Sequence, residues 1–208
     1  MKSLIVYESV CHGNTEKIAK AMAEVLNADL IKAGQVDLDS LNDYDLIGFG
    51  SGIFFGRFHE NVFGLISRLP NMPGKKAFIF STSGQGKIGY NVLVEQKLKE
   101  KGFESVGSFA CKGYDTYGPF KLVGGISKGR PNDDDIQKAR KFAEKLCIWW
   151  ANRAECKYFL FQERTYPMYR FFFVMHIWGF KRHTCMNMSS IFIFYLYTIM
   201  NAIFFGGF

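Results

Sequence analysis

The sequence has few cysteines and no pattern that pairs them. The five are odd in number, widely spaced and never in a CxxC pair: Cys11, Cys111, Cys147, Cys156 and Cys185. This usage argues against a disulfide framework and against a structural zinc site. The sequence also has no paired carboxylates, no hydrolase triad and no metal-ligand spacing. We therefore expect no catalytic side chain and no bound metal.

A strong excess of one charge is also missing from the first 150 residues. They carry 20 Lys and Arg against 17 Asp and Glu, whereas residues 151–208 carry six against two. A nearly balanced domain gives no reason to expect nucleic acid as a partner. No long apolar run follows Met1 and Lys2, which predicts no signal peptide and a reducing, cytoplasmic location.

Short apolar runs and helical stripes alternate along residues 1–150. The expected strands are residues 3–7, 28–31, 45–50, 76–82 and 104–112. The expected helices are residues 15–26, 60–69 and 90–101, with a last one beginning near Asn132. This alternation predicts an α/β fold in which helices cover both faces of a parallel sheet. Ligands bind such sheets beyond the carboxyl ends of the strands, so we expect the site there.

The loop after the first expected strand has the features of a phosphate site. Its sequence, SVCHGNT, brings hydroxyls and backbone N–H groups to the start of a helix. Convergent donors and a favourable helix dipole are what a phosphate needs. The loop is neither a GxGxxG motif nor a Walker A motif, and it suits one terminal phosphate better than a pyrophosphate. A plain turn capped by Asn14 or Thr15 is the alternative.

The run IVYESVCHGNTEKIA resembles the phosphate loop of the flavodoxin family, through Gly13-Asn14-Thr15 and the earlier hydroxyl of Ser9. It differs where Cys11 and His12 replace a single Thr, which removes one hydroxyl and makes His12 a candidate N–H donor. The resemblance spans about residues 1–150. It implies a flavodoxin-like three-layer sandwich, a five-stranded parallel sheet of order 2-1-3-4-5, and FMN as the cofactor.

Glycine-rich loops follow the third and fourth expected strands at Ser51–Gly56 and Thr82–Gly86. In flavodoxin-like proteins the first covers one face of the isoalloxazine ring and the second meets its pyrimidine edge. One of Phe54 and Phe55 is expected to stack on the flavin, with core packing as the alternative. The candidate cofactor-binding residues are Ser9, His12, Gly13, Asn14, Thr15, Gly52, Ile53, Phe54, Phe55, Gly56, Thr82, Ser83, Gly84, Gln85 and Gly86.

A long segment without periodicity, residues 113–131, follows the last expected strand. Segments of this length are usually functional or disordered. Its aromatic and basic residues and its place at the same sheet edge suggest that it walls the flavin pocket or docks a redox partner. A purely structural loop is the alternative.

Residues 151–208 form an apolar C-terminal extension that does not resemble a flavodoxin. They hold 11 of the 22 Phe, and residues 184–208 have no charged side chain. Residues 186–208 are long enough for a membrane segment, with the basic residues 181–183 on its cytoplasmic side. A buried hairpin, a dimer contact or an out-of-frame segment are the alternatives.

These observations favour an FMN-binding protein that transfers electrons to a redox partner protein. The alternative is an FMN-dependent oxidoreductase that acts on NAD(P)H and a quinone-like or porphyrinogen substrate. The replacement of a phosphate-loop Thr by Cys11 and His12 leaves open a third possibility, a non-catalytic domain that kept the fold and lost the cofactor.

Overall fold

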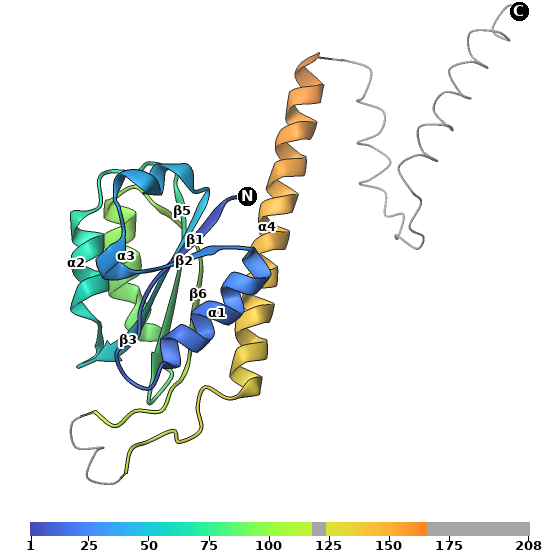
Figure 1. Cartoon of the computed structure of the whole chain (residues 1–208). Helices are drawn as coiled ribbons and strands as arrows, with labels where there is room; N and C mark the ends of the chain where they lie inside the picture. Colours follow the sequence, from blue (N-terminus) through green and yellow to red (C-terminus); the bar gives the residue numbers. More distant parts are fainter. Residues whose placement is uncertain (118–123, 166–208) are drawn as a thin grey trace, which may run out of the picture. The chain divides into compact units, whose positions relative to one another are not determined.

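The computed structural model describes residues 1–117 and 124–165 (Figure 1). Strands and helices alternate along this part of the chain, as the sequence predicts. The strands are β1 (Ser3–Glu8), β2 (Asp29–Lys32), β3 (Leu46–Phe54), β4 (Arg57–Phe58), β5 (Lys76–Ser83) and β6 (Glu104–Lys112). The α-helices are α1 (Asn14–Leu26), α2 (Glu60–Arg68), α3 (Val92–Glu100) and α4 (Asp133–Thr165).

The sheet has the order β2-β1-β3-β5-β6, and these strands are all parallel. This corresponds to the predicted order 2-1-3-4-5. The one addition is β4, a two-residue strand that returns antiparallel along the end of β3. Glu8 pairs with Ser51, Gly52 with Thr82 and Thr82 with Cys111. The strands therefore end together at one edge, and the loops that follow them meet there.

Side chains alternate between the two faces of the sheet because the strand period is two. Leu4 and Val6 of β1 face one core and Ile5 and Tyr7 face the other. Helices α2 and α3 cover the first face and α1 and α4 the second, which makes three layers (Figure 1). Both cores consist mainly of fully buried aliphatic and aromatic residues.

Helix α4 begins where the sequence predicts. Asn132 Oδ1 accepts the N–H of Asp135 at 3.2 Å, and Asp135 Oδ2 accepts the N–H of Asn132 at 3.0 Å. This reciprocal arrangement is a capping box, which satisfies two backbone donors at the helix start. The helix continues to Thr165, past residue 150, and the compact unit that contains the sheet spans Met1–Cys156.

The candidate membrane segment, residues 186–208, lies outside the described residues. Among the helices of residues 1–117 and 124–165, none is both long enough and apolar enough to cross a bilayer.

We predict that Gly48→Ala destabilises the sheet. A methyl group at Gly48 would overlap the ring of Phe78 on the neighbouring strand, and overpacking of this kind costs about 1–3 kcal/mol. Gly64→Ala in α2 is the matched control, because no atom lies within 4 Å of its added Cβ. Alanine in a helix should leave stability equal or higher. Urea unfolding of both variants checks this, and equal midpoints would contradict it.

Candidate cofactor site

Two adjoining pockets open at the carboxyl edge of the sheet, and Ile53, Ser83, Gly84, Asp115 and Tyr117 line both. We call them the inner pocket and the outer pocket. The inner pocket is lined by Val10, Cys11, Asn14, Thr15, Gly52, Ile53, Phe54, Thr82, Ser83, Gly84, Gly113, Tyr114, Asp115 and Tyr117. The outer pocket is lined by Ile53, Phe55, Gly56, Ser83, Gly84, Gln85, Tyr90, Asp115, Tyr117 and Ile126.

The first loop delivers the N-terminus of α1 to the inner pocket. His12 and Gly13 both adopt left-handed backbone, with φ of 56° and 66°, and the helix starts at the next residue. Gly13 provides no side-chain cap. Ser9 instead turns its hydroxyl to the first helical turn and accepts the N–H of Glu16 at 3.3 Å. The helix start therefore combines a positive dipole end with backbone donors at the pocket.

Buried hydroxyl and amide groups form the floor of the inner pocket. The hydroxyls of Thr15 and Thr82 lie 2.8 Å apart, and both residues are almost fully buried. Asn14 Nδ2 donates to the carbonyl oxygen of Tyr114 at 2.8 Å. These two bonds join the first loop to β5 and to the segment after β6, so three parts of the chain fix the floor.

His12 points toward the long segment. Its Nε2 lies 2.9 Å from Thr116 Oγ1, and its ring lies 4.4 Å from the ring of Tyr114. His12 is exposed and does not line either pocket. In this arrangement His12 ties the first loop to residues 114–116.

The loop after β3 is a tight hairpin turn. Phe55 and Gly56 occupy the turn between β3 and β4 with φ of 50° and 78°. Two-residue turns with positive φ favour Asn and Gly, and a bulky residue there is strained. Phe55 is nevertheless 86% exposed. Tyr117 packs edge-on against both Phe54 and Phe55, with ring centroids 5.7 and 5.1 Å apart.

The loop after β5 is held by its own side chains. Ser83 Oγ accepts the N–H of Gly86 at 2.9 Å, and Tyr90 donates its hydroxyl to Gln85 Oε1 at 3.1 Å. Gly84 has to be glycine, because a Cβ there would overlap the side chain of Ile126. The loop therefore packs directly against the end of the long segment.

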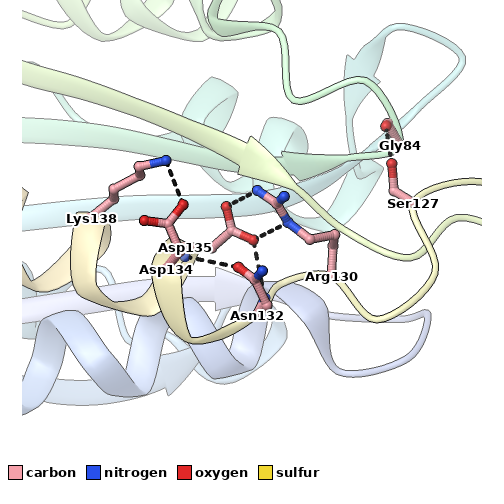
Figure 2. Close-up of polar contacts among 7 residues, drawn as sticks. All are labelled: Gly84, Ser127, Arg130, Asn132, Asp134, Asp135 and Lys138. Carbon is pink, nitrogen blue, oxygen red and sulfur yellow. Dashed lines mark hydrogen bonds and ion pairs between the residues drawn. The ribbon is translucent and has the colours of Figure 1, made fainter.

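The long segment is fastened to the domain by a set of contacts that we call the clasp. Asp115 and Ile126 exchange two backbone hydrogen bonds of 3.0 and 2.9 Å. Ser127 donates its hydroxyl to the carbonyl oxygen of Gly84 at 2.7 Å. Arg130 binds both carboxylate oxygens of Asp135 at the start of α4 (Figure 2). The clasp consists of Asp115, Ile126, Ser127, Arg130 and Asp135.

Cys111 lies behind the site at the end of β6. Burial, and secondarily the charge of Asp135, raises the pKa of its thiol to about 12. A thiol with that pKa stays protonated at neutral pH, so it is neither a nucleophile nor a source of charge for the pockets.

The structure brings eleven of the predicted residues into the lining of the two pockets. They are Asn14, Thr15, Gly52, Ile53, Phe54, Phe55, Gly56, Thr82, Ser83, Gly84 and Gln85. Ser9, His12, Gly13 and Gly86 support the loops from behind and do not line either pocket.

The sequence prediction of individual residues omitted part of the wall. The lining also includes Val10, Cys11, Tyr90, Gly113, Tyr114, Asp115, Tyr117 and Ile126. Most of these belong to the long segment, which the sequence predicts as a wall only as a whole. The signals were its position after the last strand and its aromatic residues, among them Tyr114 and Tyr117, whereas no local motif singled out Asp115.

The donor set fits a phosphate monoester joined to a flat aromatic ring. The inner pocket offers neutral hydroxyl and amide groups and a helix N-terminus, which suit phosphate oxygens. The outer pocket offers aromatic and aliphatic walls with glycine backbone between them, which suit a planar ring. FMN, the cofactor implied by the sequence resemblance, has both parts.

Known proteins match the chain over the same region. A family model described as flavodoxin domain matches residues 4–121. An uncharacterized protein of Methanocaldococcus jannaschii is 51% identical over 148 residues, covering 70% of this chain and 98% of that protein. A flavodoxin of Nostoc sp. is 28% identical over 138 residues, covering 60% of this chain and 80% of that protein.

Solved structures agree on the fold. An archaeal flavodoxin structure has a TM-score of 0.51 and 22% identity, covering 69% of this chain and 94% of its own. A flavodoxin from Streptococcus pneumonia has a TM-score of 0.53 and 18% identity, and the match covers 71% of this chain and 99% of that chain. These likenesses bear out the flavodoxin-like α/β fold that the sequence predicts.

We predict that Arg130→Gln loosens the clasp and leaves the sheet intact. The change removes the charged partner of the buried carboxylate of Asp135, and leaving such a group unpaired costs about 3–5 kcal/mol. Amide exchange should accelerate at Asp115 and Ile126 and stay unchanged in β1 and β3. Arg140→Gln is the control, since Arg140 pairs with an exposed Glu24. Uniform acceleration in all strands would contradict a local role.

Proposed function

We propose that this chain, which belongs to the flavodoxin family, binds FMN in the two pockets and carries electrons to redox partner proteins. Flavodoxin-family proteins bind FMN, and the flavodoxin-like domain implies electron transfer. The observation that carries the proposal is the continuity of a hydroxyl- and amide-lined pocket at the α1 N-terminus with an aromatic pocket beside it.

In this proposal each pocket holds one part of the cofactor. Asn14, Thr15 and Thr82 of the inner pocket hold the phosphate end together with the N–H groups at the α1 start. Residues 53–56 and 83–85, with Tyr90, surround the ring. FMN supplies the redox chemistry when it is bound, and the chain binds it, orients it and sets its surroundings.

Among the described residues, Asp115 is the one formally charged side chain that lines the inner and outer pockets. No Lys, Arg or His lines either one in residues 1–117 and 124–165, and the nearby Cys111 thiol remains protonated. A site of this composition suits transfer of electrons more than chemistry that requires a positioned proton donor. Carriage of electrons is therefore the function that the site supports best.

The first test is the visible spectrum of the purified full-length chain, with the released cofactor identified by mass. We predict flavin bands and FMN at about one per chain. A colourless chain that takes up no added FMN would contradict the proposal.

Thr15→Val tests the inner pocket. The variant keeps the shape of Thr15 but removes a hydroxyl that, in this proposal, donates to the phosphate, and a hydrogen bond to a charged group contributes about 1.5–3 kcal/mol. We expect the Kd for FMN, measured by flavin fluorescence quenching, to rise about tenfold. Ser67→Ala in α2 is the control, because its exposed hydroxyl bonds only to Phe63. An unchanged Kd in Thr15→Val would exclude this hydroxyl pair from the site.

A reductase of small acceptors is the second candidate, favoured by a third pocket. It shares Tyr117 with both other pockets. Its wall combines phenylalanine rings with three charged or titratable side chains, Arg57, His59 and Glu60. Such a pocket has room for an aromatic acceptor with an anionic group. His59 Nδ1 accepts the N–H of Asn61 at 3.3 Å, which leaves Nε2 as the ring nitrogen able to donate.

NADPH oxidation in the presence of naphthoquinone sulfonate distinguishes the two candidates. A carrier should consume no NADPH until a separate flavodoxin reductase is added. A reductase should turn over alone, and Arg57→Gln should then raise KM for the sulfonate without changing FMN content. Turnover without added reductase would replace the carrier proposal with the second candidate.

A further inference from the structure

The sequence suggests His12 as an N–H donor to phosphate, yet its ring contacts the long segment after β6. His12 Nε2 lies 2.9 Å from Thr116 Oγ1, and the ring centroids of His12 and Tyr114 are 4.4 Å apart. Neither His12 nor Thr116 lines the inner or the outer pocket. The proposed binding of FMN therefore makes no direct use of this pair.

The contact between His12 and Thr116 joins two walls of the inner pocket. One group of lining residues comes from residues 10–15 of the first loop and the start of α1, and another from residues 113–117. His12 lies within the first stretch and Thr116 within the second, and a hydrogen bond between their side chains connects them. These walls can separate at this point only if the contact opens.

A second, deeper bond connects the same two stretches. Asn14 is 8% exposed, and its Nδ2 donates to the carbonyl oxygen of Tyr114 at 2.8 Å. A Cβ on Gly113 would lie 2.8 Å from that Nδ2, so the chain leaving β6 packs directly on Asn14. The buried bond fixes the start of the segment, whereas the exposed His12 holds the part that continues to Tyr117. The contact made by His12 can therefore open while β6 stays in place.

The backbone of His12 also points to a role for its side chain. Its φ is 56°, in the left-handed region that few residues other than glycine adopt, although His is more frequent there than most. Strain of this kind persists where surrounding contacts hold the residue, and it is concentrated at functional sites. For His12 those contacts are the hydroxyl of Thr116 and the ring of Tyr114.

We propose that His12 and Thr116 form a latch that sets how fast the cofactor enters and leaves the site. The assignment rests on the proposed binding of FMN. His12 is a positioning residue, because it holds residues 114–117 against the first loop and gives no bond to the cofactor. The latch joins two groups of the protein, so losing it lowers the barrier to entry and to release alike. Rates of exchange should change while affinity stays nearly constant.

The test removes either half of the latch in the full-length chain. His12→Asn keeps a residue that tolerates the left-handed backbone, but its shorter side chain ends before Thr116. Thr116→Val keeps the shape of the side chain and removes the hydroxyl. Stopped-flow flavin fluorescence gives the association and dissociation rate constants for FMN. We expect both constants to rise about fivefold, the worth of one ordinary hydrogen bond, and Kd to change less than about twofold.

Two comparisons separate a latch from a contact with the phosphate. Riboflavin has no phosphate, so loss of a latch should speed its exchange by the same factor as that of FMN. Loss of a phosphate contact should affect FMN alone. Thr116→Ser retains the hydroxyl and should keep the parent rates. The double variant His12→Asn/Thr116→Val should exchange FMN no faster than His12→Asn, because the same bond is lost in both.

Three outcomes would overturn the assignment. Unchanged rate constants in both single variants would show that the pair does not control exchange. A rise in the dissociation rate alone, for FMN and not for riboflavin, would make His12 a ligand of the phosphate. A parent chain that takes up no FMN would remove the proposed function and the latch together, and the visible spectrum distinguishes that case from the other two.

Discussion

The ion pair between Arg130 and the buried carboxylate of Asp135 is the contact on which the site depends most. Asp135 is 2% exposed, and a buried carboxylate needs a charged partner to offset its lost hydration. The same carboxylate caps α4 through the N–H of Asn132. One side chain therefore fixes both the start of α4 and the end of the long segment. Just before Arg130 in the chain, Ser127 donates a hydrogen bond to Gly84 and Ile126 pairs with the backbone of Asp115. These bonds complete the walls of both pockets.

The turn between β3 and β4, which forms another wall of the outer pocket, has a strained backbone at Phe55. Phe55 accepts a left-handed backbone in a two-residue turn, although a smaller residue would fit that turn at lower cost. Phe55 nevertheless remains 86% exposed, so it gains little burial in return for the strain. A strained, exposed aromatic residue at a pocket points to a ligand contact. Tyr117, which packs on Phe54 and Phe55, joins this wall to the one held by the clasp.

The electrostatics of the site differ from those of the whole chain. Hydroxyls, amides and the dipole of α1 suit a phosphate without any lysine or arginine in the lining. Asp115 is the one formally charged side chain that the described residues bring to the lining, while residues 1–150 are nearly balanced in charge. The charge within a few ångströms of a cofactor acts more strongly than distant, screened surface charge.

The sequence by itself determined the alternation of strands and helices and the sheet edge at which the candidate pockets open, and it predicted eleven of the residues that line them. Those features depend on apolar periodicity, glycine placement and capping at Asn132, which are local and readable along the chain, whereas the strand order was implied by the resemblance to the flavodoxin family. Only the tertiary structure decided that Ser9 and His12 contact Glu16 and Thr116 and do not line the pockets, whereas Asp115 and Tyr117 line them. Those orientations arise from contacts across about a hundred positions, such as His12 with Thr116 and Asn14 with Tyr114. No local pattern encodes such contacts, because they exist only once the sheet brings the loops together.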